Sequence, residues 1–108
     1  MYEVSKKDWK LYREKIPDWQ EAYMERLNKE YVELLTNGEG HASDRFWALD
    51  ERMKEDKRKP GVQIRVAKSE MLFQIALLLQ DEAITMEDLN DFSQDIRDAV
   101  NMILNRML

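Results

Sequence analysis

Apolar side chains along the first third of the chain recur every three or four residues, the spacing that places side chains on one face of an α-helix. The series runs Trp9, Tyr12, Ile16, Trp19, Tyr23, Leu27, Tyr31 and Leu34. Pro17 interrupts it, and a proline inside a helix removes one hydrogen bond between successive turns. We therefore predict a short helix near 5–15, a break or kink at Pro17, and a second helix near 18–36.

Polar residues at the ends of these segments predict where the helices begin and end. Ser5 followed by Asp8 resembles the capping box with which many helices begin. Asn37 and Gly38 are the residue types that most readily accept a left-handed conformation at a helix C-terminus. The second predicted helix therefore ends there.

A third helix is predicted after a loop that contains Gly38 and Gly40. Ser43 precedes an apolar set and is the expected N-cap, and Pro60 with Gly61 stops the helix near Lys59. The apolar set consists of Phe46, Trp47, Leu49 and Met53. Because only about six residues separate this helix from the one before, an antiparallel hairpin is expected.

The segment 62–80 allows two interpretations. Val62, Ile64 and Val66 alternate with polar residues in a strand-like period, but the rest of the chain offers no second strand. The segment is therefore either the first turns of a helix that continues through Leu79 or an extended piece that pairs between subunits. We predict a helix that begins at residue 62 or 68 and ends at 80.

The last helix is the clearest one in the pattern. Thr85 with Asp88 forms a second capping-box sequence. The apolar face that follows comprises Leu89, Phe92, Ile96, Val100, Ile103 and Leu104. Together these patterns predict an all-α fold, with residues 1–108 forming one domain, a bundle of four main helices plus a short N-terminal helix.

The amino-acid composition limits the kinds of catalytic and metal-binding site that the chain can form. Apolar residues make up 44% of the 108 residues and charged residues 36%, and there is one histidine and no cysteine. Disulfides, thiolate metal sites and cysteine nucleophiles are excluded. His41 lies in the glycine-containing loop without an evident partner, so we expect a solvated side chain. No catalytic triad, acid–base pair or phosphate-binding loop is recognisable. We expect neither an enzyme nor a bound cofactor or metal.

Net charge and hydropathy indicate which partners and which cellular location to expect. The formal net charge is −5, whereas a compact nucleic-acid-binding protein usually carries a basic surface. The most apolar run, 71–79, spans nine residues against the roughly 20 that a membrane-spanning helix needs. The first residues contain no apolar stretch typical of a signal peptide. We therefore expect a cytoplasmic protein without a membrane segment.

Three stretches carry a resemblance to a known group. They are IPDWQEAYMERLNKEY (16–31), RFWALDERMKEDKRKPGV (45–62) and ITMEDLNDFSQDIRDAV (84–100). These stretches resemble short, functionally uncharacterised, all-helical bacterial proteins. The resemblance implies a small, soluble, self-contained bacterial domain, and its motifs are helix caps and core positions, so it assigns no functional residue.

Three groups of side chains are candidates for binding a partner. The aromatic group comprises Trp9, Tyr12, Trp19 and Tyr23, the basic group Lys54, Lys57, Arg58 and Lys59, and the acidic group Glu87, Asp91, Asp95 and Asp98. The aromatic spacing first predicts core positions, but such side chains are also enriched at binding hot spots. The acidic residues recur at steps of four, four and three, which stacks them on one face of a single helix.

The predicted function is a helical protein–protein interaction module. The partner is an unidentified protein or a second copy of the chain in a symmetric dimer, with the basic and acidic groups setting the orientation. The alternative is a nucleic-acid-associated regulator that uses the basic segment 52–68. Nucleic acid is the less expected partner, because no aromatic residue lies within this segment to stack on bases.

Overall fold

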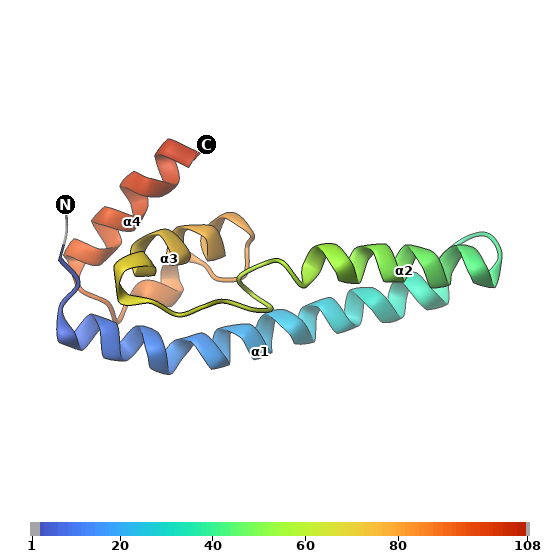
Figure 1. Cartoon of the computed structure of the whole chain (residues 1–108), viewed down its shortest axis with the longest axis horizontal. Helices are drawn as coiled ribbons and strands as arrows, with labels where there is room; N and C mark the ends of the chain where they lie inside the picture. The colour runs from blue at the N-terminus through green and yellow to red at the C-terminus, as the bar shows by residue number, and fades with distance from the viewer. Residues whose placement is uncertain (1–2, 108) are drawn as a thin grey trace.

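The computed structural model describes residues 3–107. Its elements are α1 (Lys6–Asn37), α2 (Ala42–Asp56), α3 (Met71–Gln80) and α4 (Gln94–Met107), with short 3₁₀ helices η1 (Lys68–Glu70) and η2 (Met86–Leu89). None of the described residues lies in a strand, so the predicted all-α class is confirmed. The molecule measures 52 × 27 × 23 Å, and α1 runs along its whole length (Figure 1).

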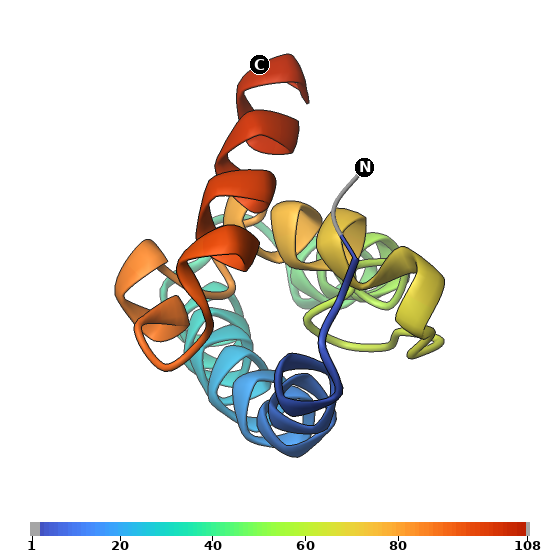
Figure 2. The same cartoon turned by 90° about the vertical axis from the view of Figure 1, so that its left-hand side faces the viewer.

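The hydrophobic core lies at one end of the molecule. It is built from the first half of α1 together with α3, η2 and α4, which Figure 2 shows gathered around the N-terminal part of α1. Its fully buried side chains are Tyr12, Met71, Ile75, Leu78, Leu89, Ile96 and Val100. The core cluster contains no residue of α2, so the helices do not all share one core.

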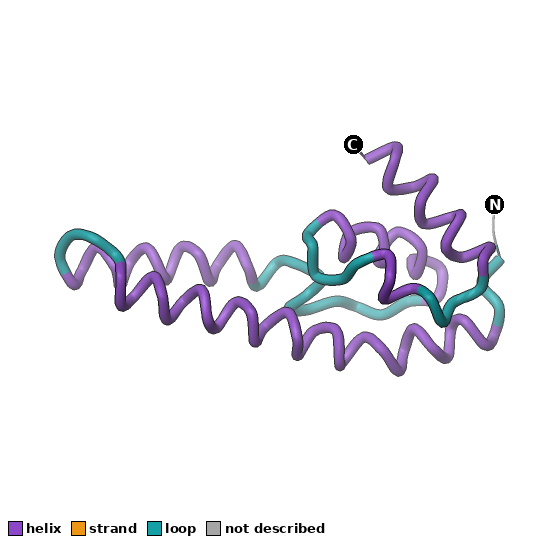
Figure 3. The backbone as a smooth tube through the Cα atoms, turned by 180° about the vertical axis from the view of Figure 1, so that it is seen from behind, coloured by secondary structure: helices purple, strands orange, loops and turns teal. Residues whose placement is uncertain are grey.

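The other end of the molecule is a two-helix arm. We call the segment 20–37 of α1 together with α2 the arm. The two helices run antiparallel and are joined by a short loop (Figure 3), as the brief connection between them predicted. Because the arm projects beyond the core, α2 has α1 as its one packed helical neighbour.

The predicted break at Pro17 is wrong, because α1 is continuous through this residue. The missing amide leaves the carbonyl of Arg13 without its helical donor, but both residues are exposed and water can take the donor's place. Ile16 and Trp19, on either side of Pro17, are buried in the core. Their packing outweighs the local penalty of about 3 kcal/mol for an interior proline.

The predicted ends of the arm helices also need correction. Gly38 is extended (φ −66°, ψ 145°) rather than left-handed, and the positive φ of 91° falls on Gly40. The N-cap of α2 is His41 instead of Ser43, and its amide donates to the Asp44 carboxylate at 2.9 Å. The helix ends at Asp56, before the predicted Lys59.

Val62 lies in a turn, residues 63–67 have no regular secondary structure, and α3 does not begin until Met71. The prediction of a helix that begins at residue 62 is therefore wrong. The alternative start at residue 68 agrees with the structure, because η1 begins at Lys68. Buried Gln74 decides the path of this segment: its amide donates to the carbonyl of Arg65 at 2.8 Å, and its carbonyl accepts from the Tyr12 hydroxyl at 2.6 Å.

The C-terminal helix begins later than predicted. The amide of Thr85 does donate to the Asp88 carboxylate at 2.8 Å, but this cap begins the short η2 rather than α4. The start of α4 is set by Ser93, whose hydroxyl accepts from the amide of Ile96 at 3.3 Å. Leu89 and Phe92, at the two ends of the turn between η2 and α4, are both buried in the core.

Candidate functional site

A group of large apolar side chains lies in solvent on the arm. Phe46 and Trp47 on α2 are each 61% exposed, and their rings meet edge to face with centroids 5.0 Å apart. Val32 and Leu35 on α1 are 63% and 45% exposed, and Met53 on α2 is 39% exposed. We call these five side chains the arm face. Large apolar side chains that are exposed and clustered in this way are typical of binding surfaces rather than of ordinary protein surface.

Helix geometry places the members of the arm face on one side of the arm. The more buried residues mark where the two helices face each other: Leu27, Tyr31 and Leu34 on α1, and Arg45, Leu49, Arg52 and Asp56 on α2. The next residue along a helix is turned by about 100° from a facing position. Because the helices are antiparallel, this rotation carries residues of both helices to the same side of the pair.

Four members of the arm face occupy such positions. Val32 follows Tyr31 and Leu35 follows Leu34 on α1. On α2, Phe46 follows Arg45 and Met53 follows Arg52. Trp47 comes one residue later, about 200° from the facing position, so it points away from α1, and its ring contact with Phe46 connects it to this side. The same rule also puts Asn28, Asp50 and Lys57 on this side. The arm therefore presents a mostly apolar face that spans both helices, with Asp50 between Phe46 and Met53 along α2.

The opposite side of the arm is acidic. Residues one position before the facing residues turn the other way. All seven are exposed and five are acidic, the set being Arg26, Glu30, Glu33, Asp44, Ala48, Glu51 and Glu55. A shallow hollow on this side is lined by Ala48, Glu51, Arg52 and Glu55. The arm is therefore amphipathic, with one apolar side and one acidic side, and a partner with an apolar surface would bind to the apolar side.

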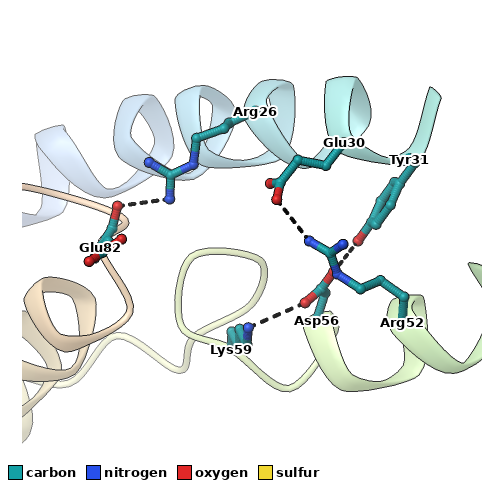
Figure 4. A network of polar contacts seen from close by, with 7 residues as sticks. All are labelled: Arg26, Glu30, Tyr31, Arg52, Asp56, Lys59 and Glu82. Atoms are coloured by element: carbon teal, nitrogen blue, oxygen red, sulfur yellow. Dashed lines mark hydrogen bonds and ion pairs between the residues drawn. The ribbon is translucent and has the colours of Figure 1, made fainter. Parts of the chain in front are cut away.

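A buried carboxylate holds the two arm helices together (Figure 4). Asp56 is 2% exposed. Its carboxylate accepts a hydrogen bond from the Tyr31 hydroxyl at 2.5 Å. It also lies 3.3 Å from the Arg52 guanidinium and 3.4 Å from the Lys59 ammonium. Arg52 also reaches Glu30 on α1 at 3.1 Å. Because the charge at the C-terminal end of α2 is fully paired, the helix tolerates an anion where its dipole disfavours one.

Tyr31 and Arg52 of this network keep their ionisation states near neutral pH. Burial raises the pKa of Tyr31, and the hydrogen bond to the Asp56 carboxylate raises it further. The hydrogen bond to Glu30 raises the pKa of Arg52 against the opposing effect of burial. Tyr31 stays a hydrogen-bond donor and Arg52 stays a cation, so the link between α1 and α2 is stable at neutral pH.

The base of the arm is fixed to the core by three contacts. The side-chain amide of Gln20 donates to the Pro60 carbonyl at 2.9 Å, and Arg26 donates to the carbonyl of Glu82 at 2.8 Å (Figure 4). Gly61 lies against the Tyr23 ring so closely that a Cβ there would come within 2.4 Å of a ring carbon. The arm face is thus carried on an ordered support, which lowers the entropy that a partner must remove on binding.

The predicted aromatic candidates lie mostly in the interior. Tyr12, Trp19 and Tyr23 are buried, as the core interpretation of their spacing predicted, and they cannot contact a partner in this structure. Trp9 is partly buried, with the Arg13 guanidinium 5.0 Å from its ring centre. The exposed aromatic pair belongs instead to α2.

The basic candidates are divided between ion pairs and solvent. Lys54 pairs with Asp50 at 2.8 Å and Lys59 with Asp56 at 3.4 Å. Lys57 and Arg58 are exposed. The basic group therefore does not form one continuous patch of unpaired cations.

The predicted acidic stripe on one helix is wrong. Glu87 lies in η2 and Asp91 in the following turn, where it pairs with Lys15 of α1 at 3.4 Å. Asp95 and Asp98 alone lie on α4, and Asp98 accepts the side-chain amide of Gln94 at 2.8 Å. The turn between η2 and α4 separates the four carboxylates.

Sequence reasoning missed the arm face because it used Phe46 and Trp47 only as members of the apolar set that locates the third helix. A signal was present: on both predicted hairpin helices, apolar residues occur at adjacent positions, as at 31–32, 34–35 and 46–47. Such pairs widen the apolar stripe beyond what a single neighbouring helix can cover. The excess indicates a surface that needs a further partner.

Comparisons with protein families, curated proteins and solved structures return no match to this chain. Within residues 3–107, no three histidine, aspartate or glutamate side chains are grouped so that they could hold a metal ion. The same residues include no helix of the length and apolar character required to cross a membrane.

Proposed function

We propose that this chain is a protein–protein interaction module that binds a helical protein partner through the arm face. The observation that carries the proposal is the solvent exposure of Phe46 and Trp47 beside Val32, Leu35 and Met53 on an ordered hairpin. Aromatic side chains concentrate binding energy at protein interfaces. An apolar face formed by two neighbouring helices can pack against one or two further helices.

The size of the arm face supports this function. An aromatic side chain covers about 150–250 Å² when it is fully buried, so the two rings at 61% exposure leave on the order of 250 Å² in solvent. With the three aliphatic side chains, the arm face exposes roughly 500 Å² of apolar area, in the upper range of patches on monomeric proteins.

The alternative, a nucleic-acid-associated regulator that uses residues 52–68, has less support. Arg52, Lys54 and Lys59 each form an ion pair with a carboxylate of this chain, which reduces the positive charge available to phosphates. No aromatic residue lies within the segment. We therefore assign the interaction to the arm face.

The test is affinity capture from an extract of the native cells with the full chain as bait. The wild type is compared with the double variant Phe46→Ala, Trp47→Ala and with Phe73→Ala, which removes a half-exposed aromatic ring from α3 in the core region. The proposal expects a discrete protein, identified by mass, that the wild type and Phe73→Ala retain and the double variant loses. Equal capture by all three baits, or by none, rejects it.

A further inference from the structure

Building on the proposed function, we infer that the arm face binds the arm face of a second copy of this chain. The two arms lie side by side and point in the same direction, and their four helices form an intermolecular bundle. The twofold axis runs along the arms, so α1 of each copy lies on α2 of the other. Shape, charge and area each support this arrangement.

The arm face is self-complementary in shape. A twofold axis along the arms brings Leu35 of one copy to Phe46 of the other, and Val32 of one copy to Met53 of the other, because each pair lies at about the same height along the arm. Small side chains on α1 thus meet large ones on α2, which is how helical layers interdigitate.

Charges at the base of the arm agree with the same arrangement. Glu21 and Glu25 border the apolar side of α1, while Lys54 and Lys57 border that of α2, and all four are exposed. The contact between Arg52 and Glu30 sets the heights of the two helices and places Lys57 level with Glu25. In the inferred dimer, each Glu25 therefore lies beside the Lys57 of the other copy.

The alternative twofold axis, across the arms, is disfavoured. It would place α1 on α1 and α2 on α2 in opposite directions, with the base of one arm on the tip of the other. Glu25 would then lie near the uncharged residues Thr36 and Asn37 at the end of α1. Because this arrangement leaves Glu25 without an opposite charge, whereas the other pairs it with Lys57, the contacts of Glu25 favour the arrangement with both arms pointing the same way.

The area is adequate for a stable pair. Two arm faces together expose roughly 1,000 Å² of apolar surface, to which the charged border adds, and specific interfaces begin near about 1,000 Å² in total. Closed twofold pairs are the commonest solution for a self-complementary patch. The bundle also gives α2 the second and third helical neighbours that it lacks within one chain.

The first test measures the mass of the purified full chain in solution. Size exclusion with light scattering over micromolar to near-millimolar concentration is expected to give twice 13.0 kDa. The double variant Phe46→Ala, Trp47→Ala should run as a monomer with an unchanged circular dichroism spectrum, because both rings are solvated in one chain. Phe73→Ala should remain a dimer.

The second test reverses the charges at the base of the arm. Glu25→Lys and Lys57→Glu should each raise the dissociation constant roughly tenfold, because each creates two like-charged contacts per dimer. The chain that carries both changes should regain wild-type affinity. An equimolar mixture of the two single variants should form a heterodimer, since every contact across the twofold axis is then between opposite charges.

The outcomes separate this inference from the proposed function. A wild type that is monomeric at every concentration, or a dimer that survives loss of both rings, overturns the inference. Failure of the charge-reversed pair to recover overturns the arrangement with both arms in the same direction. If the purified chain is monomeric while capture from extract still depends on Phe46 and Trp47, a different protein occupies the arm face, and the proposed function stands without the second copy.

Discussion

Asp8 on the first turn of α1 binds Ser93 at the start of α4, 85 positions further along the chain. The amide of Ser93 donates to one carboxylate oxygen at 3.0 Å, and its hydroxyl donates to the other at 2.8 Å. The Ser5 hydroxyl also donates to this carboxylate, at 2.9 Å. One buried side chain therefore joins the beginnings of two helices and closes the core at the end opposite the arm.

This contact predicts a loss of stability in acid. Burial raises the pKa of Asp8, but the hydrogen bonds from Ser93 and Ser5 lower it more, so the folded value lies below the ordinary 3.8. A carboxyl group with a depressed folded pKa stabilises the fold above its unfolded pKa, and this contribution disappears as the pH falls through the folded pKa. The wild type should therefore lose stability as the pH falls below about 4.

The variant Asp8→Asn isolates this contribution. At neutral pH it should lower the free energy of unfolding by about 1–3 kcal/mol, which is the typical contribution of hydrogen bonds to a charged group. The difference from wild type should shrink as the pH falls below 4. Asp18→Asn, at an exposed position on the same helix, is the matched control. Urea unfolding at several pH values measures all three proteins, and a difference independent of pH would contradict this role for Asp8.

The Asp56 network predicts that the arm can be loosened separately from the core. Asp56→Asn removes the buried charge that Arg52 and Lys59 share. We expect the free energy of unfolding to fall by about 2 kcal/mol, since the two cations remain partly solvated while the link between α1 and α2 is weakened. Hydrogen exchange should accelerate in α2 more than in α3 or α4.

The control for this variant is the exposed ion pair on the same helix. Lys54→Gln removes the contact of Lys54 with Asp50 and should change stability by less than about 0.5 kcal/mol. Uniformly faster exchange throughout the chain in Asp56→Asn would show that the arm and the core unfold together, which is not the expected result.

The continuity of α1 through Pro17 predicts that replacing the proline stabilises the protein. Pro17→Ala restores an amide that can donate to the carbonyl of Arg13, and the side chain at this position is exposed, so no packing is lost. We expect a gain of about 1–2 kcal/mol, because the helix-propensity difference of about 3 kcal/mol is partly offset by a more flexible unfolded chain. Thermal unfolding followed by circular dichroism gives the change.

Glu14→Ala, at another exposed position on α1, controls for the helix propensity of alanine and should change the stability little. A lower melting temperature in Pro17→Ala would indicate that the chain does bend at this residue.

Local periodicity was sufficient for the class of fold and for most of the buried positions. The three- and four-residue steps of Tyr12, Ile16, Trp19 and Tyr23 predicted their burial, and Ser5 and Thr85 were identified as helix caps from spacing alone. These features depend on residues within one or two helical turns of each other, and such short-range relations can be read from the amino-acid sequence alone.

Tertiary packing decided what the periodicity left open. Whether Pro17 breaks α1 depends on whether Ile16 and Trp19 have a core to enter, and whether residues 62–67 are helical depends on Gln74, which holds the Arg65 carbonyl. The four acidic residues share a helix only if the chain does not turn between η2 and α4. Each outcome rests on contacts between distant segments, which no local pattern encodes.

The arm face shows the same division. The sequence by itself determined that α2 has an apolar stripe containing Phe46, Trp47 and Met53, because a side chain's position around a helix follows from its number. Only the tertiary structure decided that α3 and α4 pack on the first half of α1 and leave this stripe in solvent. The core forms from the first half of α1 and the shorter elements and contains no residue of α2, so the arm is left with an uncovered side.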